Sequence, residues 1–177
     1  DLIGWANDSF MLHAQFPVLQ VNLLDKDQIR DRILGINPSL IIHCAALASL
    51  EGSEADPDLA MRLNAEVPGE IARVAFEQDI KMIHISTDAV FDGQRGGYTE
   101  TDIPSPLNVY AQTKLEGEFA VRSANKEAII ARVNFYGWSL SGKRSLAEFF
   151  FNNLSQNINV NGFKDVFFCP LYTRQLG

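Results

Sequence analysis

The sequence predicts an α/β fold: a doubly wound parallel sheet with helices on its faces. Apolar runs of strand length alternate with longer segments of helical period, which is typical of such sheets. Of the 177 residues, 46% are hydrophobic and 21% are charged, a composition that suits a globular chain with a sizeable core. No run approaches the roughly 18 consecutive apolar residues that a membrane-spanning helix needs. We therefore expect a soluble, cytoplasmic α/β protein.

The N-terminal part is expected to form two short strands and a helix. The strands are predicted at residues 2–5 and 18–21. The helix is predicted at 26–36, because Asp25 is an acidic residue placed to open it and Asn37-Pro38 breaks the chain after it. The expected buried stripe of this helix is Ile29, Ile33 and Leu34.

The central part is expected to continue the alternation of strands and helices. Three aliphatic residues in succession, at positions 40–42, predict a strand at 39–44 that is buried on both faces, as strands of parallel sheets are. Apolar residues recur at helical spacing over 58–77, where Pro68 is expected to kink or break the helix. A further strand is predicted at 81–85.

The C-terminal part begins with a long segment rich in Gly, Asp and Pro. This segment, residues 92–107, is predicted to be a loop, and its length suggests a function. A helix is expected at 108–122, a strand at 127–134, and a second helix at 145–156 that carries three consecutive phenylalanines.

Charge, cysteine and histidine content exclude several classes of function. A net charge of -7, without a Lys/Arg cluster, argues against a nucleic-acid or membrane partner. Cys44 and Cys169 lie far apart in apolar company and are expected to be buried free thiols in a reducing compartment. His13, His43 and His84 lack metal-ligand spacing, so no metal site is expected. The latter two lie within apolar strand patterns and are interpreted as packed histidines.

The strongest chemical signal is Tyr110 and Lys114 on one predicted helix, after Thr87 at the end of a strand. A separation of four residues puts the phenol and the ammonium on one helix face. Tyrosine has a pKa of about 10, and a nearby cation such as Lys114 favours its phenolate. Thr87 could hydrogen-bond the same carbonyl oxygen that Tyr110 protonates. Together these residues predict carbonyl reduction, with a hydride that a cofactor must supply.

Blocks spread over nearly the whole chain resemble the extended short-chain dehydrogenase/reductases. The resemblance is greatest to the dTDP-4-dehydrorhamnose reductases and to their relative, the regulatory beta subunit of methionine adenosyltransferase. The matching blocks are Asn22-Leu23-Leu24-Asp25, Ile42-His43-Cys44-Ala45-Ala46, Leu63-Asn64-Ala65, the run from His84 to Gly93, Tyr98-Thr99-Glu100-Thr101-Asp102, Pro106-Leu107-Asn108-Val109-Tyr110, Lys114-Leu115-Glu116-Gly117-Glu118, and Arg132.

This resemblance implies a Rossmann-type domain at residues 1–160, followed at 161–177 by the start of a substrate-binding part. It implies that Thr87, Tyr110 and Lys114 are catalytic, with Tyr110 as the proton donor. The cofactor, NADPH or NADH, is expected to contact Asn22, Leu23, Cys44, Ala45, Ala46, Leu47, Ser86, Tyr110, Lys114, Val133 and Asn134. The substrate is expected to contact Thr87, Asp88, Ala89 and Phe135.

The chain also departs from the pattern of the reductases. They usually carry tyrosine where this chain has Ala89 and tryptophan where it has Phe135, and residues 47–54 differ from their threonine- and lysine-bearing segment. The sugar pocket is therefore expected to differ more than the chemistry. The Gly-rich turn that holds a pyrophosphate is also missing, since Gly4 stands alone. We accordingly expect both ends of the natural domain to lie outside this sequence.

The resemblance implies reduction of a dTDP-4-keto-6-deoxy sugar, a step of dTDP-rhamnose biosynthesis, by a protein that could be a homodimer. Two alternatives stay open: a sugar-nucleotide epimerase or dehydratase of the same fold, and a regulatory subunit without turnover. The choice between NADH and NADPH is open too, because residues 6–8 give no clear basic or acidic signal. Asn64 is either an active-site amide or a tie that holds a loop.

Overall fold

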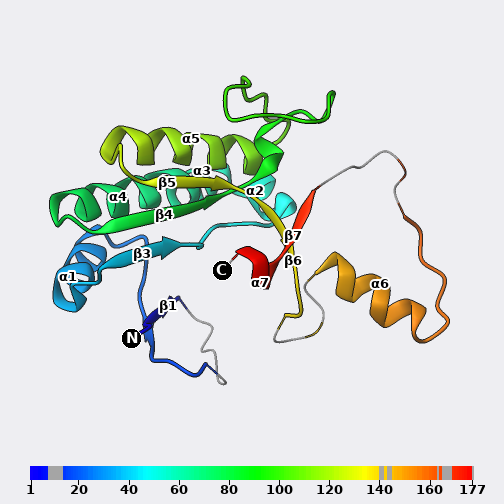
Figure 1. Ribbon diagram of the computed structural model, residues 1–177, viewed down its shortest axis with the longest axis horizontal. Coiled ribbons are helices and arrows are strands. Elements are labelled where there is room, and N and C mark those ends of the chain that lie inside the picture. The colour runs from blue at the N-terminus through cyan, green and yellow to red at the C-terminus, as the bar shows by residue number, and fades with distance from the viewer. Residues whose placement is uncertain (8–13, 140–141, 143–144, 163, 165–168, 177) are drawn as a thin grey trace.

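The structure is a computed structural model that describes residues 1–7, 14–139, 142, 145–162, 164 and 169–176 (Figure 1). Its strands form three parallel groups. The largest has the order β3-β4-β5, with β3 at Leu40–His43, β4 at Lys81–Ser86 and β5 at Ile129–Arg132. β1 (Gly4–Ala6) pairs with β2 (Val18–Gln20), and β6 (Asn134–Tyr136) pairs with β7 (Pro170–Tyr172). The expected α/β class with parallel strands is therefore confirmed.

Helical segments connect these strands. They are α1 (Lys26–Ile36), α2 (Leu50–Ala55), α3 (Pro57–Met61), the π-helical turn η1 (Arg62–Glu66), α4 (Val67–Glu77), the 3-10 turn η2 (Asp88–Val90), α5 (Val109–Ala124), α6 (Leu146–Leu154) and α7 (Thr173–Leu176). None of the helices in the described ranges is long and apolar enough to cross a membrane.

Local signals set the bounds of α1. The Asp25 side chain accepts a hydrogen bond from the Gln28 amide at 3.0 Å, which caps the helix where the sequence predicts its start. Asn37 ends the helix in the left-handed conformation, with a φ of 48°. Ile29 and Ile33 are buried as expected, but Leu34 is 42% exposed, so its place in the predicted stripe was wrong.

Helices α4 and α5 lie side by side over one face of the three-stranded sheet (Figure 1). The core between these helices and the sheet contains Val67, Ile71, Val74, Met82 and Val121. On β3 the side chains alternate: His43 is buried, whereas Leu40 and Ile42 are 43% and 56% exposed. The prediction that this strand is buried on both faces was therefore wrong, because α4 and α5 cover only one of its faces.

The predicted helix at 58–77 is interrupted by the π-helical turn η1. Pro68 lies in the first turn of α4, directly after η1, so the structure has a π-helical turn next to this proline and the helical run continues through it. The turn brings its backbone close to α5: a Cβ added to Gly117 would lie 2.1 Å from the Asn64 carbonyl oxygen. Glycine at position 117 therefore permits the contact between the two helices.

Two other expectations differ from the structure. The strand predicted at 127–134 is two strands, because Val133 separates β5 from β6, and β6 pairs with β7 in another sheet. Helix α2 was not predicted. It is capped by Ser49, whose side chain accepts from the Gly52 amide at 3.0 Å, a signal that the sequence contained.

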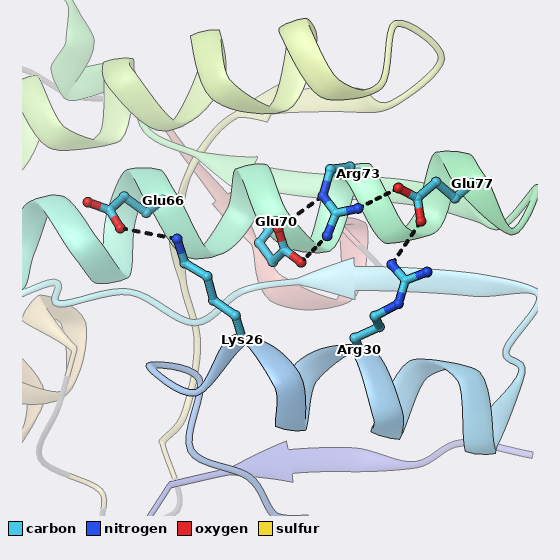
Figure 2. Close-up of polar contacts among 6 residues, drawn as sticks. All are labelled: Lys26, Arg30, Glu66, Glu70, Arg73 and Glu77. Atoms are coloured by element: carbon cyan, nitrogen blue, oxygen red, sulfur yellow. Dashed lines mark hydrogen bonds and ion pairs between the residues drawn. The ribbon is translucent and has the colours of Figure 1, made fainter.

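Charged side chains join α1 to the η1–α4 segment (Figure 2). Arg30 pairs with Glu77 at 2.8 Å, Arg73 pairs with both Glu70 and Glu77 on its own helix, and Lys26 lies 3.7 Å from Glu66. These side chains are largely accessible to water, so each pair contributes little stability. They orient α1 along the rim of α4, while Ile29 and Ile33 supply most of its attachment to the core.

Candidate active site

The carboxyl ends of β3, β4 and β5 meet at one edge of the sheet. His43 is opposite His84, and Ser86 is opposite Arg132, so the residues that follow these strands share this edge. Asn108 caps α5 and accepts a hydrogen bond from the Ala111 amide at 2.8 Å, which starts that helix just before Tyr110. Helix α5 contacts β4 and the η2 turn that follows it, so its first turns lie at the end of β4.

The structure brings Thr87, Tyr110 and Lys114 together at this edge. The Thr87 side chain lies close enough to the Tyr110 phenol to lower its pKa. Lys114 is buried, with 3% of its surface exposed, and its Nζ donates to the Ile85 carbonyl oxygen at 2.7 Å. The backbone segment from Ile85 to Thr87 thus contacts both side chains of the predicted helix pair.

The pKa of Tyr110 is raised, mainly because the phenol is buried. The Thr87 side chain lowers it and the charge of Asp88 raises it further. The expectation that Lys114 favours the phenolate was wrong for this arrangement, because Lys114 is not among the groups that shift this pKa and burial raises it. A tyrosine that stays protonated at neutral pH suits a proton donor.

The pKa of Lys114 is shifted in the opposite direction, because burial disfavours its charged form. Burial lowers its pKa from 10.5 to about 8, and the charge of Glu118 partly opposes this change. The ammonium therefore still dominates at neutral pH. Its proton is held less tightly than that of an exposed lysine, mainly because the ammonium is buried.

Thr87 is fixed by its own backbone neighbourhood. Its Oγ1 accepts a hydrogen bond from the Ala89 amide at 3.1 Å, which caps the η2 turn, and it is 8% exposed. The predicted substrate contacts Asp88 and Ala89 belong to this turn, and both are half-buried. Phe135 lies on β6 and is 51% exposed.

His43 and His84 form a buried pair beside this site, which confirms that they pack in the sheet. Their Nδ1 atoms are 3.2 Å apart and their ring centroids are 5.2 Å apart. Burial and the charge of Lys114 lower the pKa of His43 to about 4 and that of His84 to about 3, so both rings are neutral. Their Nε2 atoms are buried without a hydrogen-bond partner. His13 lies outside the described residues.

Asn64 ties the segment after β3 to the catalytic helix. Its Oδ1 accepts from the Leu47 amide at 2.7 Å, and its Nδ2 donates to the Leu47 carbonyl at 3.2 Å and to Thr113 Oγ1 at 3.0 Å. The Thr113 hydroxyl donates to the Tyr110 carbonyl at 3.0 Å. Of the two roles left open for Asn64, the tie is the one the contacts support.

Sequence reasoning missed a buried ion pair behind the site. Glu118 is 3% exposed and accepts hydrogen bonds from Arg132, while the Ser86 hydroxyl donates to it at 2.5 Å. Ser86 is one of the expected cofactor contacts, and that role stays a prediction; its hydroxyl is directed to Glu118. The spacing of four residues between Lys114 and Glu118 was a signal that could have identified the carboxylate.

The other predicted cofactor residues are spread over three strand ends. Cys44 and Ala45 are exposed after β3, and Ala46 and Leu47 are half-buried. Val133 and Asn134 follow β5 and are half-buried. Asn22 Oδ1 accepts a hydrogen bond from the Leu24 amide at 3.0 Å, and Leu23 packs against the core.

These residues fit a dinucleotide in part. Short side chains at 44–46 leave the end of β3 accessible to a flat ring or a ribose. The Lys114 ammonium has three N–H bonds, so it can donate to a ribose hydroxyl besides the Ile85 carbonyl. Asp8, in the segment expected to read the ribose 2′ position, lies outside the described residues.

The cysteines differ from the expectation. Both are free thiols, but both are exposed, so the predicted burial was wrong. Partial burial of the Cys44 thiol raises its pKa, with the charge of Lys114 acting against this. Among the described residues, no group of three or more His, Cys, Asp or Glu side chains is arranged to hold a metal ion.

Comparison with known proteins gives a family match over almost the whole chain. The model described as RmlD substrate binding domain matches residues 5–177. A probable low-salt glycan biosynthesis reductase from Haloferax volcanii is 40% identical over 123 residues, which are 68% of this chain and 41% of that protein. Methionine adenosyltransferase 2 subunit beta from Rattus norvegicus is 45% identical over 114 residues, which are 64% of this chain and 34% of that protein.

Solved structures agree with this match. A hypothetical dTDP-4-dehydrorhamnose reductase from Sulfolobus tokodaii superposes with a TM-score of 0.82 at 29% identity, over 99% of this chain and 60% of that one. A dTDP-4-dehydrorhamnose reductase from Bacillus anthracis, in complex with NADP, gives a TM-score of 0.73 at 27% identity, over 82% of this chain and 53% of that one. The chain thus spans 34–41% of these curated relatives and 53–60% of these solved chains.

Proposed function

The chain belongs to the RmlD substrate binding domain family, and from this premise we propose that the protein reduces the keto group of a nucleotide-linked sugar. The observation that carries the proposal is the grouping of Thr87, Tyr110 and Lys114 at the carboxyl edge of the sheet. The substrate that fits the family best is a dTDP-4-keto-6-deoxy sugar. The structural neighbour with bound NADP supports a nicotinamide dinucleotide as the reductant.

Each of the three side chains has a separate task in this scheme. Tyr110 is protonated at neutral pH and gives its proton to the carbonyl oxygen as negative charge develops there. Thr87 hydrogen-bonds the same oxygen and holds it near the phenol. Lys114 would hold a ribose hydroxyl of a bound cofactor, and its charge would stabilise the tyrosinate left after proton transfer.

A bound dinucleotide would supply the hydride, since no side chain can donate one. The contribution of this chain to its binding is the accessible end of β3 at residues 44–46, the Lys114 ammonium, and the half-buried residues Val133 and Asn134 after β5. Asn64 holds the segment after β3 in place, because it hydrogen-bonds the backbone N–H and carbonyl of Leu47.

The test is oxidation of NADPH and of NADH by the protein at its full natural length, with a dTDP-4-keto-6-deoxy sugar as acceptor. We expect one dinucleotide to be oxidised for each sugar reduced at the keto carbon. Formation of an isomeric keto sugar without net oxidation would instead identify an epimerase. Tight dinucleotide binding with no turnover on any nucleotide-linked keto sugar would contradict the reductase.

A second candidate is a subunit that binds a dinucleotide and a partner enzyme without turnover of its own. The observation that favours it is the 45% identity to methionine adenosyltransferase 2 subunit beta. Stable co-elution of the full-length protein with a methionine adenosyltransferase catalytic subunit, together with no reductase activity, would support this candidate. Reductase turnover in the absence of any partner would contradict it.

A further inference from the structure

Glu118 is a buried carboxylate that the scheme above does not use. It lies on α5 one turn after Lys114 and joins this helix to the ends of two strands. Its Oε1 accepts the Ser86 hydroxyl at 2.5 Å, and Arg132 Nη2 donates to its Oε2 at 2.6 Å. Arg132 Nε donates to both carboxylate oxygens at 3.0 Å. One side chain of α5 therefore fixes the end of β4 and the end of β5 together.

Lys114 and Glu118 contact consecutive residues of β4. The Lys114 ammonium donates to the Ile85 carbonyl, and the Glu118 carboxylate accepts from the Ser86 hydroxyl. Residues four apart lie on the same face of a helix, so these two contacts align α5 along the last residues of the strand. Thr87 comes next in the chain, and its position relative to Tyr110 depends on this alignment.

Glu118 is the larger of the two coulombic influences that raise the pKa of Lys114, and Cys44 is the other. The titratable and charged groups that face Lys114 or its immediate partners come from α5, β4, β3, η2 and β5. They are Tyr110 and Glu118 on α5, His84 on β4, His43 on β3 and Cys44 directly after it, Asp88 on η2, and Arg132 on β5.

Most of these groups are neutral or face elsewhere. The two histidines are neutral because burial lowers their pKa values to about 4 and about 3. Burial raises the pKa values of Tyr110 and Cys44, so these are neutral too. The charge of Glu118 opposes the desolvation that lowers the pKa of Lys114, whereas Arg132 neutralises part of that charge.

We propose that Glu118, held by Arg132, is a positioning residue for the reduction: it fixes Ser86 and Thr87 against the helix that carries Tyr110 and Lys114. The inference rests on the proposed function for its catalytic meaning. Its physical content, the coupling of a buried carboxylate to the lysine and to the strand end, can be measured without any substrate.

The first test replaces one charge at a time in the full-length protein and follows the titration of Lys114. The NMR chemical shift of the Lys114 side chain, followed across a pH series, reads its pKa directly without a reagent that must reach the buried amine. Glu118→Gln is expected to lower this pKa by about one unit, the size typical of losing a close opposite charge. Arg132→Gln is expected to raise it, because Glu118 then acts without its partner. The basic limb of the pH–rate profile should move in the same directions.

Glu116→Gln is the matched control, because it removes the same charge from an exposed position of the same helix. This variant is expected to leave the pKa of Lys114 unchanged. A Glu118→Gln variant that titrates like the wild type would overturn the proposal, and so would a shift of both buried variants in one direction. If the wild type reduces no sugar, the proposed function fails, while the titration of Lys114 still decides the coupling.

Ser86→Ala provides a test that keeps both charges and removes one hydroxyl, so it decides the case even if neither charge variant folds. The Lys114 titration is expected to stay where it is. The kcat for reduction is expected to fall several-fold, because Thr87 loses its fixed neighbour. A fully active Ser86→Ala variant would overturn the positioning role.

Discussion

Acidification is expected to destabilise the protein through the buried pair of His43 and His84. The folded chain holds both rings neutral, with pKa values of about 4 and about 3, whereas an exposed histidine has 6.5. Below pH 6.5 the unfolded chain therefore binds protons that the folded chain does not. Stability is full above this pH and is lost as the pH falls toward about 4 for His43 and about 3 for His84.

The size of this effect follows from the two shifts. At pH 5, protonation of each histidine in the unfolded chain lowers the free energy of the unfolded state by about 2 kcal/mol. The two histidines together therefore lower the free energy of unfolding by about 4 kcal/mol. The rings share a hydrogen bond and titrate as a unit, so this sum applies to the pair and not to either ring. It is a large part of the 5–15 kcal/mol that stabilises a typical domain.

Urea unfolding of the full-length protein at pH 7, 6 and 5 measures this loss. For the wild type we expect the free energy of unfolding to fall by about 4 kcal/mol between pH 7 and pH 5. In His84→Phe, which keeps an aromatic ring of similar size, the fall should be clearly smaller, because one of the two titrating rings is gone. In His43→Asn/His84→Phe the fall should nearly vanish. Equal slopes in all three proteins would refute the reasoning.

Two further substitutions test the packing and capping that place the site. Gly117→Ala is expected to cost about 3 kcal/mol, since its Cβ would meet the Asn64 carbonyl oxygen at 2.1 Å and neither backbone can yield easily. The same change in Gly35→Ala, where nothing lies within 4 Å, should stabilise by about 0.5–1 kcal/mol; a Gly117 variant as stable as this control would refute the close contact. Asp25→Ala removes the cap of α1 and should cost about 1 kcal/mol in urea unfolding, and an unchanged midpoint would show that the cap is unimportant.

The parts of the fold that the sequence predicts best are those with local causes. The starts of α1, α5 and α6 follow from Asp25, Asn108 and Ser145, each of which caps its helix with its own side chain. Exposure of Leu40 and Ile42 could not be predicted in this way. It depends on which segments cover each face of β3, and that is decided far away in the sequence.

The candidate site shows the same division. Spacing alone identifies Tyr110 and Lys114 as neighbours on one helix, and the strand end places Thr87 beside them. The direction of the Tyr110 pKa shift was not predictable, because it depends on burial. The partnership of Glu118 with Arg132 joins a helix to a strand that follows it, so only the packed structure reveals it. The roles of the expected cofactor and substrate contacts, and the boundary at residue 160, stay predictions.

The most direct test of the central claim compares Tyr110→Phe with the wild type of the full-length protein. Two quantities are measured: the rate of dinucleotide oxidation with a dTDP-4-keto-6-deoxy sugar, and the Kd of the dinucleotide. The account predicts a rate at least about 100-fold lower, the loss expected for a general acid, with Kd nearly unchanged. A Tyr110→Phe protein that reduces the sugar at the wild-type rate would contradict it.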